Sequence, residues 1–240
     1  MGNSVALFLT AWLIYLADRF ADAVSLKPDV PRSLRQDFCL RHREIWITTV
    51  ALVAGFDAYV IWRTTDLETF LIGVLVGSLA VIYLVLNHPL GVIWRSLPAK
   101  ELAIGILFAA GTLVALSPRL PAFNLSFAIA AAAFAALCSL NCVSIASWER
   151  ELDRAQRKVS IATRHPIMAR QAGSVCVALA LCAFVVAIVL RSAAPLLACV
   201  SVSALLLAWL GKSSLEGDQR TALADLVLLS PFAIFIVSSL

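Results

Sequence analysis

The feature that most constrains this chain is a series of eight long apolar runs, each bounded by charged residues or proline. The runs cover about residues 4–18, 45–62, 69–86, 101–117, 122–146, 171–190, 194–211 and 221–239. A helix needs roughly 20 mostly apolar residues to cross a bilayer. The runs are continuous, whereas the strands of a membrane barrel alternate. The sequence therefore predicts an all-α, polytopic membrane bundle of about eight transmembrane helices, forming one domain over residues 1–240.

The composition excludes most other classes of protein. Hydrophobic residues make up 61% of the 240 residues and charged residues only 14%, against roughly 25% in soluble domains. A soluble domain of this length needs a larger polar surface. We therefore exclude a soluble enzyme, a nucleic-acid-binding domain, a disordered chain and a disulfide-rich secreted domain. The net charge of +4 is assigned to loops beside the membrane, and no nucleic-acid partner is expected.

The basic residues gather on one side of the predicted membrane when the eight runs alternate in direction. Sixteen of the 19 lysines and arginines fall there: Arg19, Lys27, Arg32, Arg35, Arg41, Arg43, Arg95, Lys100, Arg150, Arg154, Arg157, Lys158, Arg164, Arg170, Lys212 and Arg220. Only Arg63, Arg119 and Arg191 fall on the other side. Because basic loops stay in the cytoplasm, both termini are expected outside. The expected location is a bacterial inner membrane, with the lipid bilayer as a partner.

Two pairs of acidic residues stand at predicted cytoplasmic helix ends. Asp18 and Asp22 end the first run, and Glu149 and Asp153 follow the fifth. The i, i+4 spacing of each pair puts two carboxylates on one face of a continuing helix, about 5–6 Å apart at Cβ. Like charges so placed repel each other, and a bridging divalent cation offsets the repulsion. Mg²⁺ suits such a site because it binds carboxylate oxygens together with water and substrate phosphate.

Ion pairing is the alternative explanation of these acids. Arg19 lies next to the first pair, and Arg150 and Arg154 are interleaved with the second. These arginines would either neutralise the carboxylates or hold a phosphate. Asp57 and Asp225 fall inside apolar runs, where an ionisable residue is costly and suggests a function. For Asp225 a structural hydrogen bond is favoured over catalysis, and Asp57 is interpreted as paired with a neighbouring helix or exposed to water.

The acidic pairs, each followed by a basic loop, resemble the aspartate-rich motifs of the UbiA superfamily of intramembrane prenyltransferases. That family is a helical bundle whose motifs, NDxxDxxxD and DxxxD, hold Mg²⁺ against the pyrophosphate of a polyprenyl donor. Asp18-x-x-x-Asp22 matches the last two acids of the first motif. Glu149-x-x-x-Asp153 matches the second, with Glu in place of the first Asp. The sequence departs from the family where Ile14-Tyr15 replaces the initial Asn-Asp, and in having one predicted helix fewer.

Two further stretches carry the same resemblance. The segment from Tyr83 to Leu107, with Arg95 and Lys100, is similar to the family's tyrosine-to-lysine loop, where a basic side chain contacts pyrophosphate. Asn141, two turns before the second acidic pair, is similar to the asparagine on the helix that leads into the family's second motif.

The resemblance implies a site made of three groups of residues. The catalytic carboxylates that would hold Mg²⁺ are Asp18, Asp22, Glu149 and Asp153. The basic residues that would bind the pyrophosphate are Arg19, Arg95, Lys100, Arg150 and Arg154. The residues that would line the substrate pocket are Tyr15, Tyr83 and Asn141.

The leading hypothesis is therefore a Mg²⁺-dependent prenyltransferase with an isoprenoid pyrophosphate donor. The metal and the basic side chains would stabilise the leaving pyrophosphate, and an acceptor would capture the allylic carbocation. One alternative is a membrane terpene cyclase, in which the chain attacks itself. The other is a non-catalytic lipid-binding or transporter-like relative. A transporter is expected to place ionisable groups near the bilayer midplane, whereas these pairs lie at helix ends, which favours an enzyme.

Overall fold

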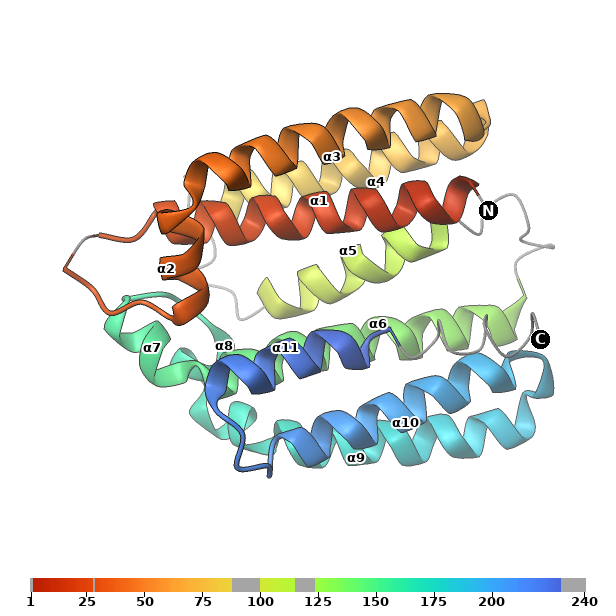
Figure 1. Ribbon diagram of the computed structural model, residues 1–240. Helices are drawn as coiled ribbons and strands as arrows, with labels where there is room; N and C mark the ends of the chain where they lie inside the picture. The colour runs from red at the N-terminus through yellow and green to blue at the C-terminus, as the bar shows by residue number, and fades with distance from the viewer. Residues whose placement is uncertain (1, 28, 88–99, 115–123, 230–240) are drawn as a thin grey trace. The chain divides into compact units, whose positions relative to one another are not determined.

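The computed structural model describes residues 2–27, 29–87, 100–114 and 124–229 (Figure 1). Every regular element within these ranges is helical, so the predicted all-α class is confirmed. The contacts divide the chain into two compact units. The first unit comprises Met1–Ser96 and Ala110–Leu120, and the second Leu97–Ala109 and Pro121–Leu240.

Five helices of the described residues are long and apolar enough to cross a membrane. They are Arg43–Thr64, Leu67–Val85, Leu125–Trp148, Pro166–Val189 and Arg191–Leu210. At about 1.5 Å per residue, a helix of this length extends roughly 28–36 Å, close to the thickness of the hydrocarbon core. The chain is therefore an integral membrane protein.

The other predicted runs coincide with helices outside this set of five. α1 (Gly2–Val24) contains the first run and continues through the first acidic pair. α5 (Lys100–Val114) contains most of the fourth run, and α11 (Gly217–Val227) the start of the eighth. Residues 115–123 and 230–240 lie outside the described residues. A total of about eight spans stays a prediction.

The first unit consists of α1, α2 (Leu34–Arg41), α3 (Arg43–Thr64) and α4 (Leu67–Asn87). α3 packs along α1, and α2 lies across the ends of both (Figure 1). Hydrogen bonds between described residues join α1 to α3: the Thr10 hydroxyl donates to Asp57 Oδ2 at 2.7 Å, and the Trp46 indole N–H donates to the Leu16 carbonyl at 3.3 Å. The interpretation of Asp57 as a partner of a neighbouring helix is confirmed, and its side chain is buried.

The second unit contains the start of α5, α6 (Leu125–Trp148), α7 (Arg150–Ala155), α8 (Ile161–Arg164), α9 (Pro166–Val189), α10 (Ala194–Leu210) and α11. The buried face of α9 carries small side chains three or four residues apart: Ala169, Ala172, Cys176, Ala180, Ala183 and Ala187. Small residues at this spacing let helices approach closely in a membrane. α6 and α10 pack against this helix and form the core with it.

Serine hydroxyls add hydrogen bonds between the helices of the second unit. Ser201 on α10 donates to the Ala180 carbonyl on α9 at 2.8 Å. Ser203 donates to the Val227 carbonyl on α11 at 3.1 Å. These bonds satisfy buried polar groups where no water is present to do so.

The start of α5 is held against α6 by a close approach at Gly105. A Cβ atom at this position would collide with the backbone of Ser139, so a residue larger than glycine does not fit. The Ser139 hydroxyl donates to the Ala135 carbonyl of its own helix at 2.9 Å. The contact keeps the polar first residues of α5 within the second unit.

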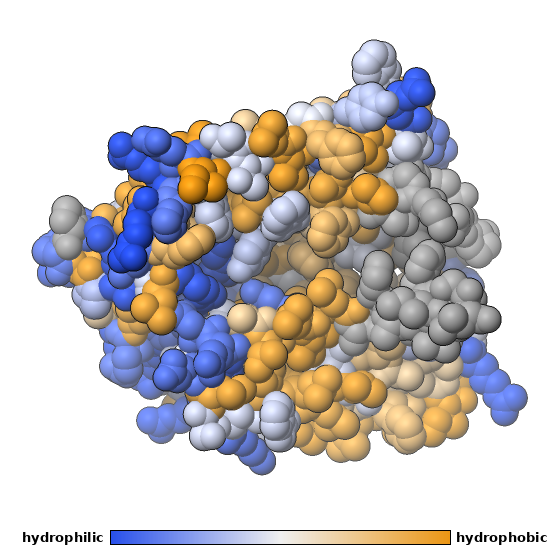
Figure 2. Space-filling view, viewed as in Figure 1, coloured by the Kyte–Doolittle hydropathy of each residue, from blue (hydrophilic) through white to orange (hydrophobic). Residues whose placement is uncertain are grey.

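The distribution of exposed side chains agrees with a membrane environment. Hydrophobic residues cover the sides of the long helices, while hydrophilic residues gather over α2 and over α7 and α8 (Figure 2). Leu52 on α3 is 70% exposed and Val189 on α9 is 72% exposed. Apolar patches of this extent are unusual on soluble monomers, so these surfaces are expected to face lipid.

Candidate functional site

The second acidic pair lies where α6 turns into α7. Glu149 forms the turn between the two helices, with φ −89° and ψ 7°. The backbone N–H of Asp153 still donates to the Glu149 carbonyl at 2.8 Å, so the pair keeps its i, i+4 relation across the turn. The Thr221 hydroxyl on α11 lies within hydrogen-bond distance of Glu149 Oε1, at 3.1 Å, and of the Gly217 carbonyl in its own helix, at 3.0 Å; Thr221 is fully buried. One carboxylate of the pair therefore also holds α11 against α6.

Asp153 is half-buried among polar groups of the following loop. Burial raises the pKa of this carboxyl above its ordinary value, and the nearby charge of Glu149 raises it further. A hydrogen bond from Ser160 and the charges of Lys158 and Lys100 act in the opposite direction. A carboxyl group under such competing influences, beside a second acid and two lysines, is a candidate for binding a metal or a phosphate.

The loop after Asp153 is shaped by backbone hydrogen bonds. The N–H of Lys158 donates to the Asp153 carbonyl at 2.8 Å, and the N–H of Arg157 to the carbonyl three residues earlier at 3.1 Å. This is the Schellman arrangement that ends many helices. Arg157 occupies the left-handed backbone position of this motif, with φ 56°, where glycine is usual. Because of this turn, Lys158 and Ser160 lie close to the side chain of Asp153.

Glu101, the second residue of α5, is 4% exposed and was not among the predicted site residues. Its Oε1 accepts the backbone N–H of Ile161 at 2.9 Å. Its Oε2 is buried and has no hydrogen-bond partner among the described residues. The hydrogen bond from Ile161 therefore links the loop that follows Asp153 to the start of α5. The only signal in the sequence was an acid in the first turn of a helix, which is common because acids favour helix N-termini.

Asn141 lies two turns before Glu149 on α6 and is 2% exposed. Its Nδ2 donates to Asp225 Oδ1 on α11 at 3.4 Å. The structural hydrogen bond that was favoured for Asp225 is therefore present. Asn141 and Glu149 therefore bind Asp225 and Thr221, two residues of α11 that lie one helical turn apart.

The arginines of α7 differ in their surroundings. Arg154 forms an ion pair with Glu151 at 3.2 Å on the exposed surface, where such pairs contribute little to stability. Arg150 is half-buried, and its Nε has no hydrogen-bond partner among the residues that the structure describes. Lys100, the first residue of α5, acts on Asp153 through its charge. Arg95 lies outside the described residues.

The first acidic pair belongs to the first unit. Asp18 and Asp22 are half-buried one turn apart on the uninterrupted α1. The Arg19 guanidinium lies 5.1 Å from the centre of the Tyr15 ring, a cation–π distance. Tyr83 is on α4 in the same unit and is 8% exposed. A single site that joins the two acidic pairs stays a prediction.

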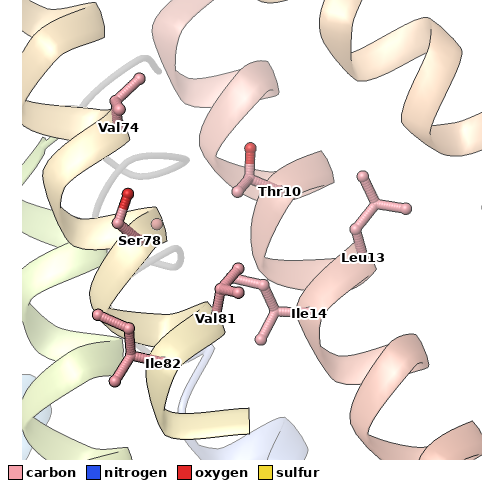
Figure 3. A pocket seen from close by; sticks show the side chains of 8 residues that line it. Thr10, Leu13, Ile14, Val74, Ser78, Val81 and Ile82 are labelled. Carbon is pink, nitrogen blue, oxygen red and sulfur yellow. The ribbon is translucent and has the colours of Figure 1, made fainter. Parts of the chain in front are cut away.

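A cavity of about 610 Å³ separates α1 from α4 in the first unit (Figure 3). Its lining residues are Thr10, Leu13, Ile14, Val74, Gly77, Ser78, Val81 and Ile82. The walls are apolar apart from two hydroxyl groups, and the volume is within the usual range of ligand pockets. Ile14 is one turn before Asp18 on α1. The cavity is suited to a hydrocarbon chain that begins near the first acidic pair.

No cluster of three or more His, Cys, Asp or Glu side chains that could hold a metal occurs in the described ranges. Mg²⁺ is often held by one or two carboxylates, with substrate phosphate and water completing its ligands. The hard oxygen donors of either pair fit such a partial site. No protein-family model, curated protein or solved structure matches the chain.

Proposed function

We propose that this integral membrane protein is a UbiA-like prenyltransferase that uses Mg²⁺ and an isoprenoid pyrophosphate donor. The observation that carries the proposal is the environment of Asp153. Its half-buried carboxyl lies beside Glu149 and is influenced by the charges of Lys100 and Lys158. Carboxylates and cations side by side are the groups needed to bind a metal–pyrophosphate complex.

The residues of this chain take separate parts in the proposed reaction. Glu149 and Asp153 would hold the cation in the second unit, and the resemblance to the UbiA motifs gives Asp18 and Asp22 of the first unit the same role. Bound Mg²⁺ supplies positive charge to the leaving pyrophosphate. Lys100, Arg150 and Lys158 bind phosphate oxygens and keep the leaving group oriented. The apolar cavity beside α1, within the first unit, has the volume and the lining to accommodate an isoprenoid chain.

We also propose the finer details of topology. The chain forms about eight spans in a bacterial inner membrane, with both termini outside and the acidic motifs in the cytoplasm. The biased distribution of basic residues supports this orientation.

A lipid-binding relative without catalysis is the second candidate. The observation that favours it is the hydrogen bond from Thr221 to Glu149, because an acid that ties α11 to α6 also has a structural role. In that case the acidic pairs stabilise helix ends, and the cavity binds a lipid chain that does not react.

Pyrophosphate release from prenyl donors of several lengths tests the proposal. With Mg²⁺ present, the protein in nanodiscs of native membrane lipids should release pyrophosphate as a membrane acceptor or water captures the prenyl cation. The release should stop when a chelator is added. Asp153→Asn should lower the rate about 10²-fold, the order seen on removing a preorganised electrostatic group. Glu151→Gln is the matched control, because this acid is exposed and on the same short helix. Absence of Mg²⁺-dependent release with every donor would favour the lipid-binding candidate.

A further inference from the structure

The short helix α2 differs from the two long helices that it connects. It has eight residues and lies across the ends of α1 and α3 (Figure 1). His42 is the C-cap of α2 and also the N-cap of α3, so the chain turns from one helix to the other at a single residue. Because α3 is apolar and long enough to span a membrane, a helix set across its end runs along the membrane surface.

The exposed face of α2 carries two large apolar side chains on either side of one charged residue, Asp37. Leu34 is 75% exposed and Phe38, one turn later, is 56% exposed. Ile45, in the first turn of α3, is 66% exposed. Cys39, by contrast, is 5% exposed and belongs to the face that packs within the first unit. Leaving the exposed side chains in water is unfavourable, whereas the boundary between headgroups and acyl chains accommodates them.

A basic hollow adjoins this apolar face. Arg41, His42, Arg43 and Glu44 line a polar depression of about 310 Å³ where α2 meets α3. Among the described residues, no hydrogen bond or ion pair reaches the guanidinium group of Arg41 or of Arg43. The His42 and Phe38 rings lie 4.7 Å apart between centroids, which places the hollow next to the apolar face.

We propose that α2 is an interfacial helix and that the Arg41–Arg43 junction binds the headgroup phosphate of an anionic phospholipid. Arginine donates two parallel hydrogen bonds to phosphate, and basic side chains beside the membrane attract anionic lipids. The exposed apolar side chains beside the hollow favour a phospholipid over a soluble phosphate as its ligand. A soluble anion would leave Leu34 and Phe38 exposed to water, whereas a phospholipid covers these side chains with its acyl chains. This site is separate from the acidic pairs and does not depend on the proposed enzyme activity.

Native mass spectrometry of the intact, detergent-purified chain can test lipid retention. We expect phosphatidylglycerol to be retained at least about fivefold more than phosphatidylcholine, since only the former carries net negative charge. The double variant Arg41→Gln/Arg43→Gln should retain both lipids equally. Arg63→Gln, which changes an exposed arginine at the other end of α3, should behave as the wild type. Equal retention of both lipids by the wild type, or the same loss in Arg63→Gln, would overturn the proposal.

A second experiment identifies what covers the apolar face. A photoreactive residue replacing Phe38 in nanodiscs should crosslink to lipid, and more strongly when phosphatidylglycerol is present. Crosslinking to a second copy of the chain would show an interface between copies instead and would overturn the proposal. Competition of lipid retention by water-soluble glycerophosphoglycerol at equal concentration would show a site for soluble phosphate esters, which also contradicts it.

Discussion

The two acidic pairs have the same spacing in the sequence and different surroundings in the structure. Asp18 and Asp22 lie on one uninterrupted helix of 23 residues. Glu149 and Asp153 lie at a turn between two helices, where Thr221 binds the first and Ser160 the second. Equal spacing therefore does not produce equal sites. The segments packed around each pair, some of them distant in the sequence, determine which polar groups surround the carboxylates.

The largest expected effect tests whether the two pairs work together despite this difference. If the proposal is correct, Asp22→Asn and Asp153→Asn should each lower Mg²⁺-dependent pyrophosphate release about 10²-fold, because each variant loses a carboxylate charge that would hold the metal. Steady-state release assays on both variants measure this. A loss confined to Asp153→Asn would show that the second pair acts alone.

The next effect concerns the loop that follows the second pair and that Glu101 binds. Glu101→Ala should lower the free energy of unfolding by about 1–3 kcal/mol, because it leaves the buried N–H of Ile161 without its acceptor. Trypsin should then cleave faster after Arg157 and Lys158, which lie in the loop that Glu101 fastens.

Glu101→Gln serves as the control for this loop, since its amide oxygen can still accept the hydrogen bond. It should resist trypsin nearly as well as the wild type. Equal cleavage of wild type and Glu101→Ala would show that the loop does not depend on Glu101, and this readout is independent of enzyme activity.

A smaller effect on stability tests whether Glu149 links α6 to α11. Thr221→Val should lower the free energy of unfolding by about 1 kcal/mol more than the same change at a threonine that binds only within its own helix, because its hydroxyl reaches Glu149 Oε1 as well as the Gly217 carbonyl of α11. Thr64→Val is the matched control, since the Thr64 hydroxyl binds only the Val60 carbonyl within its own exposed turn. Thermal melts in the same detergent compare the two, and an equal shift in both variants would contradict a specific link between α6 and α11.

The smallest expected effect is the pH dependence of stability. Burial raises the pKa of Asp153 in the folded chain above its ordinary value of 3.8. The folded state therefore binds more protons than the unfolded state between these two pKa values. The contribution of this group to stability is complete below the unfolded pKa and is lost as pH rises through the folded pKa. Asp153→Asn should remove this part of the slope in melts recorded upward from about pH 4.

Much of the helical architecture was predictable because apolar runs of spanning length have few alternatives in a chain this hydrophobic. The positions of the acidic pairs at helix ends followed from the same runs. The hydrogen-bond partners of the acidic residues could not be predicted from the sequence, because these partners come from distant segments. Asp57 was visible as an ionisable residue in an apolar run, but its partner Thr10 is 47 residues away. Glu101 contacts Ile161 across 60 residues, and no local pattern links the two.

Binding of Mn²⁺ in place of Mg²⁺, followed by electron paramagnetic resonance, tests most directly whether the two pairs form one metal–pyrophosphate site. We predict that the wild type in nanodiscs binds Mn²⁺ only when pyrophosphate is present. Asp22→Asn and Asp153→Asn should each abolish this binding, whereas Glu151→Gln should retain it. Binding that survives either Asp→Asn change, or no pyrophosphate-dependent binding by the wild type, would contradict a shared site.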